Sequence, residues 1–225
     1  MGSLSAKRTW WIIVAVLSIA LLLTATGCLR RSKENPSELT YSLPTTLTIP
    51  TDGQLPGTNI RYQGMSDDGA LVLIDGQEAL KRRGDSLDWS GQFREGVDAD
   101  LNLRVLWYTE ESLRLVGTAK IAIQDINPRP VSIVTTSPIK YSGPVAYGLA
   151  KGAVIPGSTL TYEGISDDGA ELGGISGYPY RKEGDSILWE GELRPGVYSE
   201  LSLRVVQYDD RSMRVVGIVT LWIGS

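Results

Sequence analysis

The chain has 225 residues, of which 42% are hydrophobic and 21% charged, a composition typical of folded rather than disordered proteins. A formal net charge of -4 argues against a nucleic-acid partner, because proteins that bind nucleic acids present basic surfaces. The sequence has no histidine and a single cysteine, Cys28, which excludes Ser-His-Asp and Cys-His catalytic groups, histidine zinc sites and any disulfide within the chain.

Residues 1–28 have the order of an export signal. Lys7 and Arg8 precede an uncharged apolar stretch, residues 10–23, and small residues then lead to Cys28. A basic region, an apolar region and small residues at a cleavage site, in this order, direct a protein out of the cytoplasm. We therefore expect residues 1–28 to be an export signal or membrane anchor and residues 29–40 to be a polar tether on the extracytoplasmic face.

Ala25, Thr26 and Gly27, directly before Cys28, resemble the lipobox of bacterial lipoproteins. The resemblance implies that Cys28 is lipidated, becomes the mature N-terminus and attaches the protein to the membrane. It departs from the family pattern at Ala25, where leucine is usual. Two alternatives stay open: residues 10–29 are long enough to cross a hydrocarbon core as one helix, or the signal is cleaved without lipidation.

The rest of the chain is an internal duplication with an offset of 100 residues. Residues 41–123, the first copy, align without a gap with residues 141–223, the second copy, and 30 of the 83 aligned pairs are identical. The 25 glycines and 11 prolines are scattered, which indicates short strands between turns. We expect an all-β fold of two tandem domains, one per copy, each a small antiparallel β-barrel or β-sandwich of about five or six strands.

Alternation of apolar and polar residues predicts where these strands lie. In the first copy we expect a strand around residues 60–62, another over residues 85–93, and two more over residues 101–108 and 113–123. The second copy repeats the pattern, and the last three strands of each copy form an antiparallel meander.

Residues 124–140 join the copies and contain three prolines, which favour an extended connector over regular pairing. Residues 131–135 offer one further strand to the second copy. Trp89 and Trp189 lie on the apolar face of their predicted strand, where burial stabilises a fold by about 2 to 3 kcal/mol. We interpret both rings as core residues; the alternative is that they stack on a ligand.

Both copies keep Ser-Asp-Asp-Gly-Ala, at residues 66–70 and 166–170, and a later acid, Asp85 or Asp185. The pattern predicts a turn in which aspartate accepts backbone hydrogen bonds and glycine takes a positive φ. A calcium site is the alternative, although the spacing is not that of a calcium-binding loop. Glycoside hydrolysis needs two carboxylates across a sugar, and adjacent aspartates on an extended chain point apart. We expect no metal, no other cofactor and no catalytic residue.

Both copies also keep three arginines on the polar side of the strands or in turns. We interpret them as partners of nearby acids on a solvated face, where each ion pair contributes little. The alternative is a site for an anionic ligand. These arginines are Arg94, Arg104 and Arg114, with their counterparts Arg194, Arg204 and Arg214.

The two copies differ most in one segment, residues 71–83 of the first copy and residues 171–183 of the second. None of the thirteen aligned positions in this segment is identical. We expect a surface hairpin or sheet edge here, because loops on a rigid scaffold commonly carry recognition. In the second copy the segment exposes Tyr178 and Tyr180 after three glycines, so both are candidate ligand-binding residues. Unconstrained sequence drift is the alternative.

These features predict an exported, membrane-anchored protein of the cell envelope or cell surface that is not an enzyme. Its tandem β-domains are expected to act as a binding or interaction module for a protein or an envelope polymer. Two weak sites on one tether act together through effective concentration. The alternative is a structural accessory subunit or scaffold of a larger membrane complex.

Overall fold

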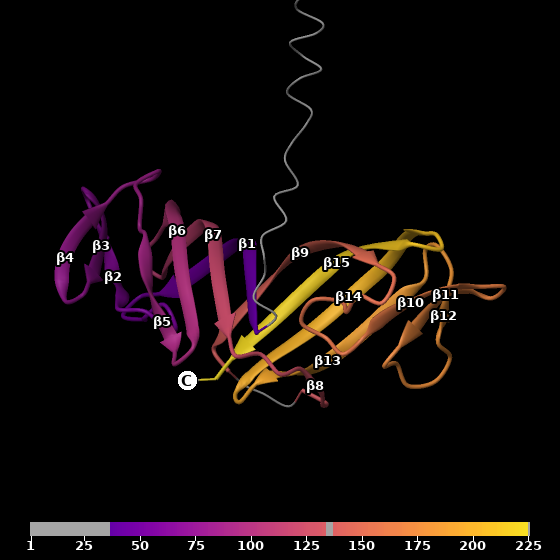
Figure 1. The fold of residues 1–225 in the computed structure, drawn as a ribbon. Helices are drawn as coiled ribbons and strands as arrows, with labels where there is room; N and C mark the ends of the chain where they lie inside the picture. The colour runs from indigo at the N-terminus through magenta and orange to yellow at the C-terminus, as the bar shows by residue number, and fades with distance from the viewer. Residues whose placement is uncertain (1–36, 134–136, 225) are drawn as a thin grey trace, which may run out of the picture. The chain divides into compact units, whose positions relative to one another are not determined.

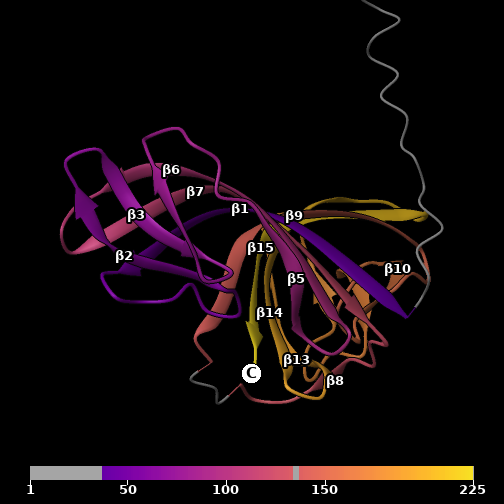
Figure 2. The same cartoon turned by 90° about the vertical axis from the view of Figure 1, so that its left-hand side faces the viewer.

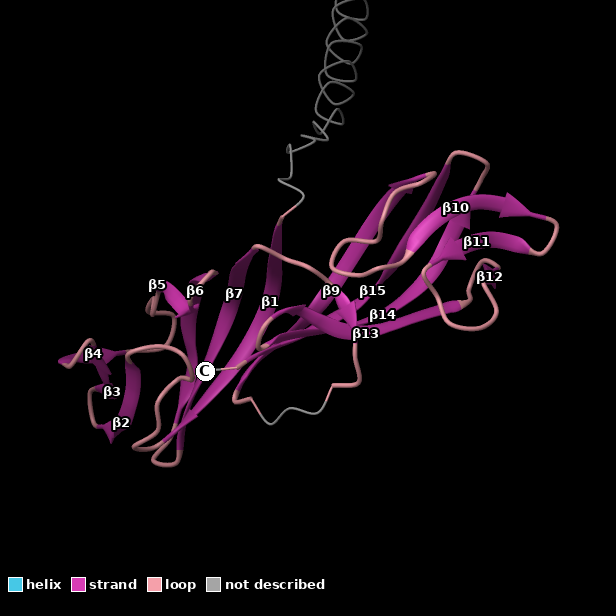
Figure 3. Ribbon diagram, turned by 60° about the horizontal axis from the view of Figure 1, so that its bottom comes forward, coloured by secondary structure: helices cyan, strands magenta, loops and turns pink. Residues whose placement is uncertain are grey.

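The computed structural model describes residues 37–133 and 137–224. All regular secondary structure in these ranges consists of β-strands (Figures 1 and 3). Neighbouring strands pair antiparallel, which confirms the expected all-β fold. All these strands belong to one compact unit. The described ranges contain no helix that is long and apolar enough to span a membrane. The apolar stretch and Cys28 lie outside these ranges.

The strands of the first copy form two sheets. The larger has the order β1-β7-β6-β5, and the smaller has the order β2-β3-β4. The predicted meander is therefore present as β5, β6 and β7. The strands are β1 (Glu38–Pro50), β2 (Ile60–Ser66), β3 (Gly69–Ile74), β4 (Gln77–Lys81), β5 (Trp89–Arg94), β6 (Val97–Tyr108) and β7 (Ser112–Gln124).

The second copy repeats this order and adds one strand at the edge. Its larger sheet runs β8-β13-β14-β15-β9 and its smaller sheet runs β10-β11-β12. The strands are β9 (Ile139–Ala150), β10 (Thr161–Ser166), β11 (Gly169–Gly173), β12 (Tyr180–Arg181), β13 (Ser186–Arg194), β14 (Val197–Tyr208) and β15 (Ser212–Ile223), with β8 (Arg129–Pro130) before them.

Each copy has seven strands where we expected five or six, because β1 and β9 were not predicted. β1 pairs with β7 over its whole length, from Glu38 opposite Gln124 to Pro50 opposite Ser112. Pro44 lies inside β1 and has no amide hydrogen to donate, which an edge strand tolerates on its unpaired side. Pro44 conceals the strand in the sequence, because a proline within a run of strand-forming residues argues against a regular strand.

The strand that the connector adds to the second copy is not the predicted one. β8 consists of Arg129 and Pro130, opposite Glu192 and Gly191 of β13, whereas we expected residues 131–135. Pro130 takes part because a proline can occupy an edge position whose amide is not needed. The prediction that the prolines would keep the connector out of the sheet was therefore wrong at this point.

The core follows the alternation seen in the sequence. In β6 every second residue from Val97 to Val105 is buried, and β14 repeats the pattern from Val197 to Val205. Tyr62 is fully buried, and its hydroxyl donates a hydrogen bond to the carbonyl oxygen of Thr109, next to the β6–β7 turn. Tyr162 does the same with Asp209. Each tyrosine thus fixes the smaller sheet of its copy onto the larger one.

The two tryptophans differ in burial. Trp189 is 6% exposed and its indole nitrogen donates to the hydroxyl of Thr159 at 3.2 Å, so its interpretation as a core residue is confirmed. Trp89 is only half-buried; it stacks on Phe93 with ring centroids 5.5 Å apart. The core interpretation therefore holds for Trp89 in part.

The two copies pack against each other through equivalent strands and residues. β1 and β9 lie side by side (Figures 1 and 2). Phe93 of the first copy stacks on Tyr141 of the second at 5.6 Å, and the hydroxyl of Tyr41 lies against Gly157. Burial raises the pKa of Tyr41, and the neighbouring phenol of Tyr147 raises it further.

Arg94 and Arg194 complete this contact in a reciprocal way. Arg94 Nη1 donates to the carbonyl oxygen of Gly224 at 3.0 Å, and Arg194 Nη1 donates to that of Gln124 at 2.7 Å. Gly224 and Gln124 occupy the same position in the two copies, so each copy offers the other the same donor and acceptor. Reciprocal contacts of this kind are the mark of two-fold symmetric dimers.

Candidate functional site

The segment that differs most between the copies forms a tight hairpin in the first copy. β3 and β4 are joined by Asp75 and Gly76, with φ angles of 51° and 79°. Positive φ at both central residues is the conformation of a type I′ turn, for which Asp-Gly is a preferred sequence. The predicted surface hairpin is thus present here.

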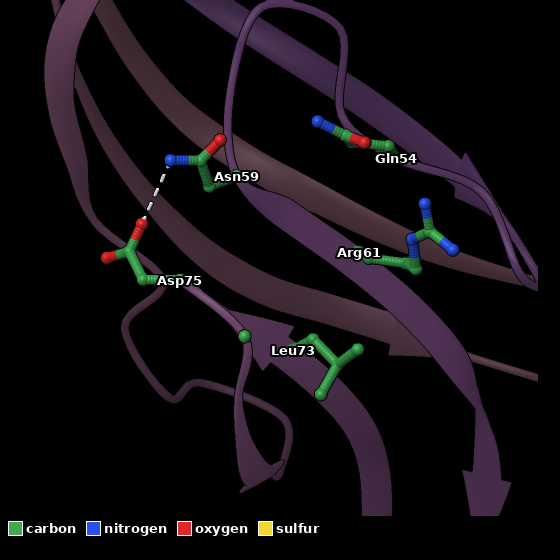
Figure 4. A pocket seen from close by; sticks show the side chains of 6 residues that line it. Gln54, Asn59, Arg61, Leu73 and Asp75 are labelled. Atoms are coloured by element: carbon green, nitrogen blue, oxygen red, sulfur yellow. Dashed lines mark hydrogen bonds between the residues drawn. The ribbon is translucent and has the colours of Figure 1, made fainter.

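A polar pocket of about 340 Å³ lies beside this hairpin (Figure 4). The lining combines the loop after β1, the start of β2 and the β3–β4 hairpin, and it provides two amides, a guanidinium, a carboxylate and one apolar side chain. The lining residues are Gln54, Asn59, Arg61, Leu73, Asp75 and Gly76.

Four backbone and side-chain contacts fix the shape of the pocket. Asn59 Nδ2 donates to Asp75 Oδ1 at 3.1 Å, and the amide of Asp75 donates to the carbonyl oxygen of Asn59 at 3.2 Å. Gln54 pairs with Arg61 in an isolated bridge, and its side-chain amide donates to the carbonyl oxygen of Thr58. Figure 4 shows Asn59 and Asp75 facing each other on one side and Arg61 and Gln54 together on the other.

Arg61 is the polar group of this pocket that is free for a ligand. Its side chain makes no hydrogen bond or ion pair with the protein within residues 37–133 and 137–224. A guanidinium offers five donors that suit carboxylate and hydroxyl acceptors. Asp75 keeps one carboxylate oxygen that accepts nothing from Asn59. The pocket can therefore bind a ligand that carries both a carboxylate and hydroxyl groups.

The second copy does not rebuild this pocket. The aligned residues have neither a charge nor a side-chain amide. They are Val154, Thr159, Thr161, Gly173, Ile175 and Ser176. The polar pocket is therefore a property of the first copy, and half of its lining comes from the segment that differs most between the copies.

Tyr178 and Tyr180 lie in the second copy and do not line this pocket. Their rings meet edge to face with centroids 5.4 Å apart, and Tyr178 is 63% exposed. Arg181 Nη1 donates to the carbonyl oxygens of Tyr178 and Tyr180 at 2.7 and 2.8 Å, which holds the loop in place. Ligand binding by the two tyrosines stays a prediction.

A second hollow of about 410 Å³ lies on the larger sheet of the second copy. It is lined by Leu188, Trp189, Glu190 and Glu200. The indole nitrogen of Trp189 already donates to Thr159, so two carboxylates and apolar groups are what this hollow presents. The side chains that line this hollow therefore provide no free hydrogen-bond donor, whereas the pocket of the first copy provides the guanidinium of Arg61.

The retained Asp-Asp-Gly sequences form turns, as predicted. Asp67 and Asp68 are the turn between β2 and β3, where the hydroxyl of Ser66 donates to the carbonyl oxygen of Gly69 at 3.0 Å. Asp85 Oδ2 accepts the amide of Arg82 at 2.7 Å, so this acid also orders a turn. No group of three or more possible metal ligands occurs among the described residues.

Four of the six retained arginines bind backbone carbonyl groups, which the sequence interpretation did not predict. Arg104 Nη1 donates to the carbonyl oxygen of Gly84 and Arg204 Nη1 to that of Gly184, both at 3.0 Å. None of the six retained arginines forms an ion pair in the described part of the chain. The clue in the sequence is that both copies keep Gly-Asp-Ser 20 residues before an arginine.

Comparison with protein families, with curated proteins and with solved structures found no match for this chain.

Proposed function

We propose that this is an exported, membrane-anchored binding protein of the cell envelope with no catalytic activity of its own. Each copy is a small β-sandwich domain of one larger and one three-stranded sheet, and the first copy carries the binding site. The observation that supports this is the pocket around Arg61, which has an unpaired guanidinium and is absent from the second copy. The proposed ligand is an envelope polymer with carboxylate and hydroxyl groups.

The pocket is tested with the full chain purified in detergent and with soluble peptidoglycan fragments that contain muramic acid, which carry both groups. Arg61→Thr introduces the residue that the second copy has at this position. We expect calorimetric titration to show binding that weakens about tenfold or more in this variant, since a hydrogen bond to a charged group contributes about 1.5 to 3 kcal/mol. Arg211→Thr, which removes an exposed arginine of the second copy, is the control.

Two results would contradict the pocket: equal affinity of the Arg61→Thr protein and the unchanged protein, or the absence of binding to any fragment.

The anchor is proposed to be Cys28. Mass spectrometry of the N-terminus of protein extracted from membranes separates the three possibilities. A diacylglyceryl group on Cys28 supports the lipoprotein. An intact Met1 indicates a single-pass anchor, and an unmodified new N-terminus indicates cleaved secretion.

The second candidate function is that of an accessory subunit or scaffold of a membrane complex. It is supported by exposed apolar side chains at the same position of both copies, since Leu106 is 49% and Val206 is 42% exposed. Size measurement of the detergent-extracted protein distinguishes the two functions. A complex of fixed stoichiometry supports the scaffold, whereas the isolated chain with affinity for the glycan fragments supports the binding protein.

A further inference from the structure

The outer edges of β5 and β13 occupy the same place in the two copies, but only β13 carries a further strand. In the second copy β8 pairs with the outer edge of β13. In the first copy β5 is the last strand of its sheet among the described residues. The β5 edge is distinct from the pocket around Arg61, and a ligand could occupy either surface without the other.

The segment over β13 shows how an extended peptide binds at this edge. Arg129 lies opposite Glu192, and their side chains form an ion pair of 2.6 Å. The amide of Val131 donates to the carbonyl oxygen of Glu190 at 3.4 Å, and that of Asn127 to the carbonyl oxygen of Leu193 at 2.7 Å. Pro130 falls between these bonds, at a position that needs no amide hydrogen.

β5 offers the same backbone groups in the same register. Gly91 faces Ala99 of β6, as Gly191 faces Ser199 of β14, and both strands shift register directly after residue 92 or 192. By this equivalence the amides and carbonyl groups of Ser90 and Gln92 point outward from β5. A strand placed as β8 is would find the same hydrogen-bonding partners.

The side chains around the β5 edge are consistent with an absent partner. Trp89 and Gly91 are half-buried, whereas their counterparts Trp189 and Gly191 are buried. Residues 89–93 contain no charge and no proline, which are the usual means of protecting a free edge from pairing. The corresponding stretch of β13 carries Glu190 and Glu192.

We propose that β5 is a docking site for an extended, proline-containing segment of another protein, which adds to the sheet as an antiparallel strand in the way that β8 adds to β13. The chain supplies the template for this ligand in residues 125–131. Gln92 stands where Glu192 binds Arg129, and its side-chain amide already donates to Asp98 at 2.8 Å. The site therefore recognises the extended backbone more than the charge of the segment.

The test uses the full chain in detergent and a synthetic peptide of residues 125–132, Asp-Ile-Asn-Pro-Arg-Pro-Val-Ser. We expect the peptide to slow hydrogen exchange of the amides of Ser90 and Gln92 by about tenfold or more at saturation, because each gains a hydrogen-bonding partner. The matched control is the same peptide with a methyl group on the arginine amide, which removes the donor to β5.

A tethered version avoids dependence on a weak affinity. Gly224 is equivalent to Gln124, so residues 125–131 attached directly after Gly224 start from the position from which the connector reaches β13. The attachment raises the effective concentration of the segment, and we expect full protection of the same amides. A Gly-Ser extension of equal length is the control. In the tethered protein, Gln92→Pro removes one of the two measured amides and should abolish the protection of the other, that of Ser90. If this variant fails to fold, the methylated peptide tests the reciprocal bond, in which the arginine amide donates to the carbonyl oxygen of Gln92.

Four results would overturn the proposal. The amides are unprotected by both the peptide and the tethered segment, or the methylated peptide protects them equally well. In the free full chain they are already protected and become exposed when residues 1–34 are removed, which would identify the N-terminal segment as the occupant. Finally, they are protected in proportion to protein concentration, which would identify a second copy of the chain.

Discussion

Trp89 and Trp189 are the same residue in the same strand of two copies, yet one is half-buried and the other is 6% exposed. Two differences lie around the strand: β8 pairs with β13 while no described strand pairs with the outer edge of β5, and Trp189 donates to Thr159, where the first copy has Asn59. In a duplicated fold, therefore, identical residues differ in burial when the segments around them differ. Substitutions at equivalent positions of the two copies test this difference.

The largest effect is expected from removing the tryptophans. Trp189→Ala should lower the free energy of unfolding by about 4 kcal/mol and Trp89→Ala by about 2 kcal/mol, because truncating a buried ring loses transfer free energy and leaves a cavity. Urea denaturation of the two variants measures the difference. Equal losses would show that the difference in burial between the two rings does not affect stability.

A smaller effect is expected at the contact between the copies. A Cβ atom on Gly157 would lie 2.6 Å from the hydroxyl oxygen of Tyr41, and the φ of 75° is itself unfavourable for alanine. Gly157→Ala should destabilise the protein by about 2 to 3 kcal/mol, of which the φ angle accounts for about 1 kcal/mol. Gly152→Ala, with a φ of 79° and open space around it, is the control that carries the φ effect alone.

Thermal denaturation measures the free energy of unfolding of both variants. If Gly157→Ala and Gly152→Ala lower it equally, Tyr41 of the first copy does not pack closely against Gly157 of the second.

The smallest effect depends on pH. Burial raises the pKa values of Tyr41 and Tyr141 above that of an unfolded tyrosine, which is about 10. The folded state therefore keeps its proton while the unfolded state loses it, so stability is complete below about pH 10 and falls as the pH rises toward the folded pKa values. The slope is at most about 1.4 kcal/mol per pH unit for each tyrosine.

Tyr41→Phe should make this alkaline loss less steep in urea titrations between pH 9 and about 11.5. An unchanged slope would mean that Tyr41 ionises equally in the folded and the unfolded chain.

The sequence was sufficient for the meander, because alternation in β6 and β7 reflects one buried face of a regular sheet. It was insufficient for β1, where Pro44 interrupts the pattern although an edge strand tolerates it. Aligning the copies also located the pocket region, since residues 71–83 are the segment that differs. The pocket itself needs the fold, because Gln54 and Arg61 meet Asp75 only when β2 pairs with β3.

The retained arginines show why identical residues within a duplication are easily misinterpreted. Arg94 contacts a carbonyl group 130 residues away, and no local pattern reveals such a partner. Retention in both copies suggests a charged surface when only the sequence is considered. For Arg94 and Arg194 it reflects instead a contact in which each copy supplies the other with the same hydrogen bond.

The length of β1 has a mechanical consequence. The chain enters β1 at Glu38, and the loop that carries Gln54 of the pocket begins after Pro50 at its other end. Under the proposed function, tension between a bound polymer and an N-terminal anchor would be transmitted along a strand of 13 residues, roughly 44 Å at about 3.4 Å per residue. When β1 is pulled along its length, the backbone hydrogen bonds between β1 and β7 share the load and must break together. A force that pulls β1 away from β7 at one end would break them one at a time. The geometry of β1 is therefore suited to resist a lengthwise load between its two ends.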